Sequence, residues 1–327
     1  MESKKEKLAE IVKNKSVLFV TTKNIDYIRN TQEIGIIKKY SKECQLIYSY
    51  KKRYVKRIIE VWIRLALYNM ENIDVIVIGF APQFVLPFYY FKMRKKTVVI
   101  DFFISIYDTL IFDRKVFKAA GVIARLSHWI DFITLKMANH IIVDTRADAQ
   151  YFIKEFKCNR NKFEIIYLEA DPLIYYPRKQ CKRRELSDKF VVLYFGSILP
   201  LQGVDIVLEA IFLLKEEKNI FFQIIGPIPK NYRKPIQENV EYIQWLEQGQ
   251  LAEYISNADL CLAGHFNKDI DKARRTIPGK AYIYEMMQKK MILGDNIANH
   301  EVFFEDEKHR FVEMGNVEKL SQLILER

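Results

Sequence analysis

The feature that most constrains this chain is an alternation of short apolar runs with longer helical segments, repeated along 327 residues. Continuous β-branched runs of five to seven residues are typical of parallel strands that are buried on both faces. Their alternation with helices predicts an α/β fold with doubly wound parallel sheets. In the first half of the chain, the clearest of these runs are SVLFVT (16–21), IDVIVIG (73–79), TVVID (97–101) and HIIVDT (140–145).

The alternation stops once and then starts again. Residues 169–189 hold two prolines and the charged run KQCKRRELSDK, so we expect them to connect two domains. We therefore predict two Rossmann-like domains, 1–175 and 176–327, whose loops at the carboxyl ends of the strands face a shared cleft. The last helix could pack back on the first domain. The strand-like runs of the second half are FVVLYFG (190–196), IFFQIIG (220–226), LCLAGHF (260–266) and MILGD (291–295).

The formal net charge is +11, from 52 Lys and Arg against 41 Asp and Glu. A basic balance is compatible with nucleic acid, an anionic membrane surface or phosphorylated substrates. We expect no nucleic-acid binding, because the chain shows no base-reading or aromatic RNA-binding motif. The positions of the basic residues along the chain therefore indicate whether the partner is a phosphorylated ligand or a membrane surface.

The cysteines and the N-terminus indicate a cytoplasmic protein. The four cysteines, at positions 44, 158, 181 and 261, form no Cys-x-x-Cys or Cys/His cluster, so neither a zinc site nor a disulfide framework is expected. The N-terminal segment MESKKEKLAE lacks the apolar core of a signal peptide. The most hydrophobic window, 73–91, is interrupted by Asp74, Gln83 and two prolines, so we expect no transmembrane helix.

The segment KARRTIPGKAYIYEMM (272–287) is the sharpest candidate for a ligand site. Pro278 lies where a helix is expected to begin, which places Lys280 in the first turn. The helix dipole opposes a cation there unless an anion lies at the same helix end. Arg275, just before the turn, could bind a phosphate through two hydrogen bonds. A solvated basic loop is the alternative interpretation.

The segment YFGSILPLQG (194–203) has the layout of a phosphate-binding turn but no positive charge. This segment predicts a strand that ends at a glycine, followed by a short loop and a second glycine at the start of a helix. Gly196 and Gly203 would let the backbone approach a ligand closely. Ser197 and Gln202 would offer neutral hydrogen bonds.

Together these segments resemble the donor domain of GT-B glycosyltransferases, specifically the retaining family 4 (glycosyl transferases group 1) bacterial enzymes. FGSILPLQGVDIVLEA resembles their G-x-x-x-P-x-x-G-x-D-x-x-x-x-A signature, and KARRTIPGKAYIYEMMQKKMILGD resembles a variant with a K-A-x-R-x-I-P-x-K run. The likeness covers most of residues 97–305. Segments that resemble the acceptor domain are DFFISIYDTLIFDRK (101–115), IIVDT (141–145) and LEADPLIYYP (168–177).

The resemblance implies a hexosyltransferase-type enzyme. It would move a sugar from a nucleoside-diphosphate sugar, with UDP favoured, to a saccharide acceptor in surface polysaccharide or glycoconjugate synthesis. Transfer would proceed with retention and without a metal or other cofactor. The donor-binding residues expected here are Gly196, Ser197, Gln202, Gly203, Gly226, His265, Arg275, Lys280 and Glu285.

The chain also departs from this family pattern. Many members carry Arg and Lys where this chain has Ser197 and Gln202. The place of a donor-binding glutamate falls on Ile283, and Glu285 is two residues away from it. These departures motivate an alternative function, a catalytically silent GT-B partner that binds a true glycosyltransferase.

Catalytic carboxylates are expected in the first domain. Asp101 ends a predicted strand, Asp108 and Asp113 follow in one loop, and burial there could raise a carboxyl pKa to a useful value. We predict Asp101 and Asp108 as catalytic. The alternative is that Asp101 caps the next segment and Asp113 pairs with a neighbouring cation. The D-x-D at 269–271 is a metal-diphosphate motif of a different fold, so no metal site is expected.

Two stretches of the first domain mix cations with apolar and aromatic residues. They are 51–66, which is predicted to be mostly helical, and FYYFKMRKK (88–96). Such patterns are found at anionic membrane interfaces. We therefore expect the acceptor to be a saccharide or a lipid-linked saccharide, which a peripheral protein reaches from the inner face of the plasma membrane. The alternative is an ordinary helix with solvated charges. The sequence does not decide whether the protein forms a homo- or hetero-oligomer.

Overall fold

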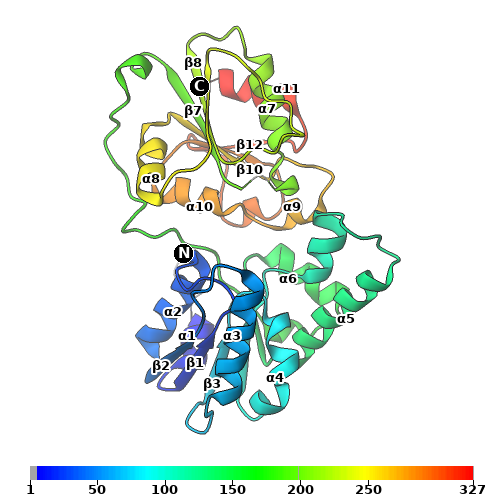
Figure 1. Ribbon diagram of the computed structural model, residues 1–327. Coiled ribbons are helices and arrows are strands. Elements are labelled where there is room, and N and C mark those ends of the chain that lie inside the picture. Colours follow the sequence, from blue (N-terminus) through cyan, green and yellow to red (C-terminus); the bar gives the residue numbers. More distant parts are fainter. Residues whose placement is uncertain (1–5, 198, 327) are drawn as a thin grey trace. The chain divides into compact units, whose positions relative to one another are not determined.

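The computed structural model describes residues 6–197 and 199–326. The chain forms two compact units, Met1–Glu169 and Ala170–Arg327 (Figure 1). The sequence placed the division between residues 175 and 176, six residues later in the same connector. Each unit contains a six-stranded sheet in which every neighbouring pair of strands is parallel, with helices on both faces. The predicted fold class, two doubly wound Rossmann-like domains, is confirmed.

The sheet of the first unit has the strand order β2-β1-β3-β4-β5-β6. Alternate residues of β1 enter two separate cores, with Leu18 and Val20 on one face and Val17 and Phe19 on the other. This burial on both faces explains why the strands are continuous apolar runs. The strands are β1 (Ser16–Val20), β2 (Glu43–Ile47), β3 (Val75–Ile78), β4 (Thr97–Asp101), β5 (His140–Val143) and β6 (Phe163–Ile165).

Helices cover both faces of this sheet. One core contains side chains of α3 (Tyr54–Leu67), α4 (Leu86–Met93), α5 (Val122–Met137) and α6 (Arg146–Glu155). The other contains side chains of α1 (Glu6–Val12) and α2 (Ile28–Tyr40). Short helical turns lie at Pro82–Phe84 and Arg160–Lys162, and a π-helix spans Asp108–Asp113. Across residues 6–197 and 199–326, no helix has the length and apolar character needed to cross a membrane.

The sheet of the second unit has the order β12-β11-β10-β7-β8-β9. The chain builds β7, β8 and β9 outward in one direction, then returns to the other side of β7 to build β10, β11 and β12. The sequence missed the two edge strands, because VEYI and HRFV are short and half-polar rather than continuous apolar runs. The strands are β7 (Phe190–Phe195), β8 (Ile220–Ile225), β9 (Val240–Ile243), β10 (Leu260–Gly264), β11 (Met291–Gly294) and β12 (His309–Val312).

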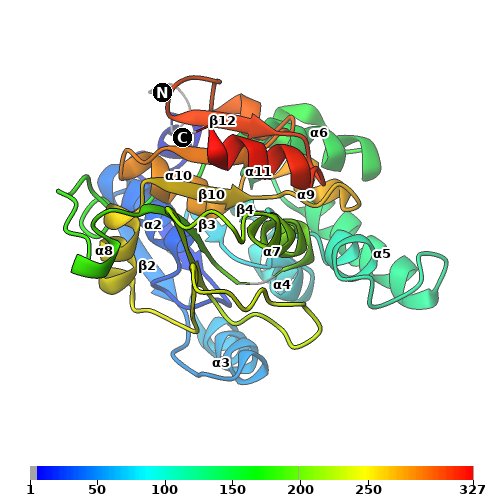
Figure 2. The same ribbon diagram turned by 90° about the horizontal axis from the view of Figure 1, so that it is seen from above.

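The helices of the second unit include α7 (Val204–Leu213) and α11 (Val317–Leu325), which pack side by side in one core (Figure 2). The last helix of the chain therefore contributes to its own unit. Two further helices, α8 (Gln248–Asn257) and α10 (Gly279–Met286), contact β7, β10 and β11. Shorter elements are α9 (Asp271–Arg275) and the turns Arg184–Leu186, Pro200–Gln202 and Asn299–Glu301.

Candidate functional site

Glycines end the strands at the point where the strand order of the second sheet reverses. Gly196 follows β7 with φ 140°, Gly226 follows β8 with φ 142°, and Gly264 ends β10 with φ 92°. Residues other than glycine rarely adopt these backbone conformations, because their β-carbon clashes with the backbone. Since ligands of open α/β sheets bind at the carboxyl ends of strands beside such a reversal, this edge is the candidate site. The sequence predicted Gly196 and Gly226 for it but missed Gly264, which stands in LCLAGHF.

Close backbone packing requires glycine at positions 226 and 203. A β-carbon on Gly226 would lie 2.2 Å from the carbonyl oxygen of Gly196. A β-carbon on Gly203, the residue that opens α7 with φ 66°, would lie 2.8 Å from the backbone of Phe266. The loops that follow β7, β8 and β10 are therefore packed against one another without intervening side chains.

The side chain of Lys280 reaches this edge from the first turn of α10. Pro278 immediately precedes the helix, as the sequence predicted, and Lys280 is its second residue. A β-carbon on Gly196 would lie 3.4 Å from the Lys280 Nζ, and one on Gly264 would lie 3.3 Å from it. The Nζ atom lies 3.7 Å from the centre of the Tyr194 ring. The amine is thus held against the ends of both β7 and β10.

The Lys280 amine is buried without a polar partner. In the described part of the chain, its Nζ has no hydrogen bond, and the residue is 6% exposed. Burial lowers its pKa well below the ordinary value for lysine. The Tyr194 ring offers a cation–π contact that is worth about 2 kcal/mol when desolvated, less than the cost of burying an isolated ammonium. A buried cation in this situation is stabilised by an anion that binds beside it.

The loop between β7 and α7 is fastened to the loop after β10. The Phe266 N–H donates to the Gln202 carbonyl oxygen at 3.2 Å, and Asn267 Nδ2 donates to the Pro200 carbonyl oxygen at 3.0 Å. Among the described residues, the buried Gln202 Oε1 has no hydrogen-bond partner, and it lies beside Gly264. Ser197 is exposed. Gln202 thus faces the same edge as Lys280.

His265 follows β10 and is buried in a left-handed conformation with φ 59°. Its Nδ1 lies 2.9 Å from the Thr276 carbonyl oxygen, so Nδ1 carries the proton and donates it. Burial lowers the pKa of the ring to about 3, so the imidazole is neutral at physiological pH. Nε2 can therefore accept a hydrogen bond. A sugar hydroxyl can donate that bond, whereas a phosphate oxygen without a proton cannot.

Two other predicted donor-binding residues make ion pairs within the protein. Arg275 is buried, and its Nε donates to Asp271 Oδ2 at 2.8 Å, one turn earlier in α9. Glu285 lies at the far end of α10, where its Oε2 is 2.7 Å from Nε2 of His309, the first residue of β12. The structure therefore brings Gly196, Gln202, Gly203, Gly226, His265 and Lys280 together, but places Glu285 at the amino edge of the sheet.

In the first unit, Asp101 ends β4 as predicted but does not face solvent. Its side chain is fully buried, and its Oδ2 accepts a hydrogen bond from Arg29 Nε at 2.7 Å. Arg29, in the first turn of α2, also donates from Nη1 to the Ile166 carbonyl oxygen at 2.9 Å. Asp101 is therefore held in a buried ion pair with Arg29, and its catalytic role stays a prediction.

Glu33 adds a second buried carboxyl to this ion pair. The Asp101 carboxylate disfavours a second negative charge on Glu33 by repulsion. Burial raises the pKa of Glu33 well above its ordinary value, and burial also raises the pKa of Asp101 against the opposing effect of Arg29. The sequence missed Arg29 and Glu33 because their segment carries no motif, and Arg29 meets its partner 72 residues away.

The loop that carries Asp108 is anchored by a third buried carboxylate. Asp131 of α5 accepts hydrogen bonds from Ser105 Oγ at 2.6 Å and from Gln83 Nε2 at 2.8 Å. Ser105 Oγ in turn accepts from the Asp108 N–H at 2.9 Å. Asp108 is buried at the start of the π-helix, an element often found at functional sites. Its catalytic role stays a prediction.

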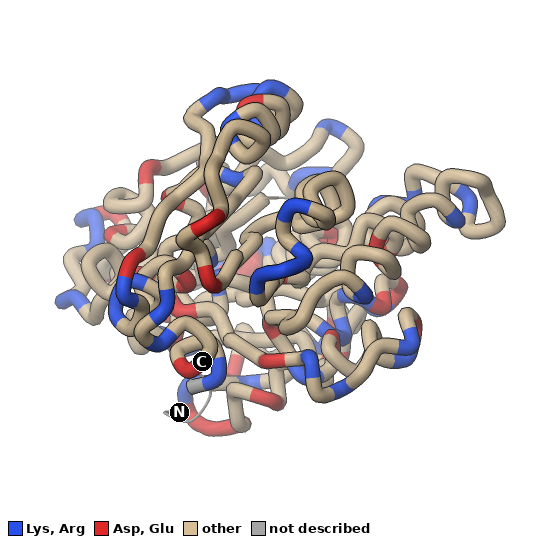
Figure 3. Tube along the Cα trace, turned by 90° about the horizontal axis from the view of Figure 1, so that it is seen from below, with Lys and Arg blue, Asp and Glu red and all other residues tan. Residues whose placement is uncertain are grey.

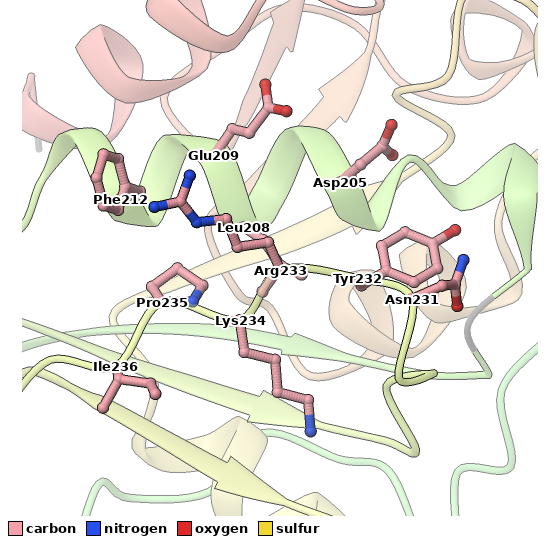
Figure 4. Close-up of a pocket in the computed structure, with 10 residues that line it drawn as sticks. All are labelled: Asp205, Leu208, Glu209, Phe212, Asn231, Tyr232, Arg233, Lys234, Pro235 and Ile236. Atoms are coloured by element: carbon pink, nitrogen blue, oxygen red, sulfur yellow. The ribbon is translucent and has the colours of Figure 1, made fainter.

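A cavity of about 620 Å³ lies elsewhere in the second unit, between α7 and the segment 231–236 (Figure 4). None of its lining residues is among the predicted donor-binding residues. Within residues 6–197 and 199–326, no three His, Cys, Asp or Glu side chains are grouped in a way that could hold a metal ion. The glycine-lined edge with Lys280 therefore remains the candidate site.

Solved structures with the same architecture are glycosyltransferases of the GT-B fold. Sucrose-phosphate synthase from Thermosynechococcus elongatus aligns over 95% of this chain and 89% of its own, with a TM-score of 0.65 and 10% identity. Anabaena HepE, solved in complex with UDP, aligns over the same shares with a TM-score of 0.63 and 10% identity. A glycosyltransferase from Rickettsia africae covers 96% and 88%, with a TM-score of 0.62 and 13% identity.

These likenesses establish the GT-B fold for this chain. No protein-family model matches the sequence, and no curated protein matches it. At identities of 10–13%, the shared feature is the fold, and the site has to be argued from its own residues.

Proposed function

We propose that this protein is a glycosyltransferase whose second unit binds a nucleoside-diphosphate sugar at the glycine-lined edge. The observation that supports this most is the buried Lys280 amine, which has no hydrogen-bond partner in the described part of the chain and lies against the ends of β7 and β10. HepE, which shares the fold, has been solved with UDP and with UDP-glucose. A diphosphate is the anion that this combination of fold and lysine favours.

The proposed chemistry follows from where charge develops. Glycosyl transfer breaks the bond between the anomeric carbon and a diphosphate oxygen, so negative charge grows on the leaving phosphate. Lys280 would stabilise that charge, together with the backbone N–H groups in the first turns of α7 and α10. Neither helix has a side-chain cap at its N-terminus. The low dielectric around Lys280 strengthens this interaction.

The finer parts of the proposal rest on the sequence resemblance. We propose retention at the anomeric carbon, as in family 4 enzymes, with a UDP-sugar as donor and neither metal nor other cofactor. The acceptor would be a saccharide, free or lipid-linked, on the cytoplasmic side of the plasma membrane. Asp108 would orient the acceptor hydroxyl. Asp101 would act indirectly, by fixing Arg29 beneath the same sheet edge.

The test is a thermal-shift measurement with UDP, GDP, ADP and their sugars. A nucleotide that binds the native state raises the melting temperature. Lys280→Met should abolish that rise, because the substitution removes the cation and keeps an apolar side chain of similar length. Lys289→Met is the matched control, since Lys289 lies beyond the other end of α10 and donates to the Ser256 carbonyl oxygen. If no nucleotide shifts the wild type, or if Lys280→Met retains the shift, the diphosphate site is refuted.

A second candidate function is a catalytically silent partner of another glycosyltransferase. The uncharged Ser197 and Gln202, and the distance of Glu285 from the site, favour it. The two functions differ in turnover. An enzyme releases free nucleotide from its donor when a suitable acceptor is supplied, whereas a silent partner binds the nucleotide and leaves the donor intact. Measurement of nucleotide release from the donor that binds therefore separates them.

A further inference from the structure

Helix α3 exposes an apolar stripe to solvent. Val55, Ile59, Ile63 and Leu67 recur every fourth residue and are between 49% and 82% exposed. The sheet-facing side of the same helix, with Val61 and Leu65, is fully buried in the core. The stripe is thus additional to the residues that hold the helix on the sheet, and folding of this unit does not require it to be apolar.

Helix α4 extends this apolar surface. It lies beside α3, because Tyr89 donates from its hydroxyl to the Trp62 carbonyl oxygen at 2.7 Å and Lys92 donates to the Leu65 carbonyl oxygen at 2.9 Å. The rings of Trp62 and Phe88 are 4.7 Å apart. Phe88 and Phe91 are 63% and 81% exposed. We call the exposed set the α3–α4 surface, formed by Val55, Ile59, Ile63, Leu67, Phe88 and Phe91.

Cations surround the α3–α4 surface. The stretch 51–67 contains five exposed Lys or Arg residues and the buried Arg57, and the stretch 88–96 contains four Lys or Arg residues, against one acidic residue, Glu60. Glu60 is itself engaged, since it accepts from Arg64 at 2.6 Å and from Ser49 Oγ at 2.7 Å. Figure 3 shows Lys and Arg gathered at the start of α3. The surface therefore combines an apolar centre with a basic rim.

We propose that the α3–α4 surface binds the interface of an anionic lipid bilayer. Its aliphatic and aromatic side chains would enter the boundary between headgroups and acyl chains, and the surrounding Lys and Arg would meet lipid phosphates. Each such cation near an anionic membrane contributes about 1 kcal/mol. A second copy of this chain is a poorer partner, because a two-fold contact through this surface would bring two basic rims together.

The test uses flotation of the full-length protein with vesicles of phosphatidylcholine, with and without phosphatidylglycerol. Binding should require the anionic lipid and weaken as salt increases. Phe91→Glu should lower the partition constant by at least about tenfold, since it removes an apolar side chain that would enter the bilayer and adds a charge that anionic lipid repels. Ile63→Glu should do the same. Both variants should keep the melting temperature of the wild type, because both side chains are exposed.

The chain offers a matched control for Phe91. Phe304 in the second unit is also an exposed phenylalanine, 74% accessible, but it is followed by Glu305, Asp306 and Glu307. Phe304→Glu should leave vesicle binding unchanged. The proposal is overturned if the wild type does not float with anionic vesicles, or if Phe91→Glu and Phe304→Glu bind equally well.

One more measurement separates a membrane from a protein partner. If light scattering shows a wild-type oligomer that Ile63→Glu dissociates, while vesicle binding is absent, the surface is a protein interface and the membrane proposal is wrong. Vesicle binding requires neither donor nor turnover, so its failure is independent of a failure of the proposed glycosyltransferase activity.

Discussion

Both units bury a cation at the carboxyl edge of the sheet, but only one of the two cations is neutralised. Arg29 in the first unit lies 2.7 Å from the Asp101 carboxylate. Lys280 in the second unit has only the face of Tyr194 and the backbone of two strand ends. A buried cation with a counter-ion is compensated within the fold, whereas a buried cation without one costs stability, which is the basis of the anion site proposed above.

The comparison extends to the protonation of neighbouring groups. Burial raises the pKa values of Asp101 and Glu33 in the first unit, so these carboxyls hold protons more tightly when folded. Burial lowers the pKa values of Lys280 and His265 in the second unit, so these bases hold protons less tightly when folded. Acidification therefore acts in opposite directions on the two sheet edges.

The largest expected effect comes from removing the neutralised cation. Arg29→Met should lower the free energy of unfolding by about 3–5 kcal/mol, because it leaves Asp101 buried without its counter-ion. Urea denaturation measures this loss. Arg64→Met is the surface control, and it should cost under about 1 kcal/mol because its pair with Glu60 is partly exposed. Equal losses in the two variants would show that the buried ion pair contributes no more to the free energy of unfolding than the exposed pair.

The same substitution at the unpaired cation should have the opposite sign. Lys280→Met should raise the free energy of unfolding by about 1–3 kcal/mol, because it removes the cost of burying an amine without a partner. Lys280→Arg should destabilise, since a guanidinium cannot lose its proton. Urea denaturation without ligand measures both. A clear loss of stability in Lys280→Met would mean that the amine is compensated in the native state, and the comparison between the units would fail.

A smaller effect should appear in the pH dependence of stability. His265 has a pKa of about 3 when folded and 6.5 ordinarily, so between these values the unfolded chain binds a proton that the native state does not. Stability is therefore lost as pH falls below 6.5. His265→Asn, which suits a left-handed backbone, should remove about 1 kcal/mol of this loss between pH 6 and pH 5. Parallel curves for the wild type and the variant would contradict the buried neutral ring.

The smallest effect concerns protons taken up on ligand binding. An anion beside Lys280 should raise its lowered pKa, so nucleotide binding should draw protons from the buffer at a pH between the pKa values of the free and the bound state. Calorimetry in two buffers of different ionisation enthalpy measures this uptake. Lys280→Arg, which is always charged, should bind without it. A binding enthalpy that does not depend on the buffer in the wild type would place the anion away from Lys280.

The sequence was informative wherever a local pattern reports a structural demand. Runs such as VIVI (75–78) are apolar throughout because both faces of the strand are buried, and the fold class followed from them. Pro278 marked the start of α10 and so placed Lys280 in its first turn. The edge strands β9 and β12 were missed, because an edge strand is half exposed and carries no such run.

What the sequence by itself determined is the fold and the segments that form the strand ends around Lys280. Only the tertiary structure decided which charged residues are neutralised. Asp101, predicted as a catalytic carboxylate, pairs with Arg29, which lies 72 residues earlier. Glu285, predicted as a donor contact, pairs with His309. The physical reason is that strand and helix patterns depend on neighbours in sequence, whereas burial and ion pairing depend on side chains that meet only when the sheet assembles.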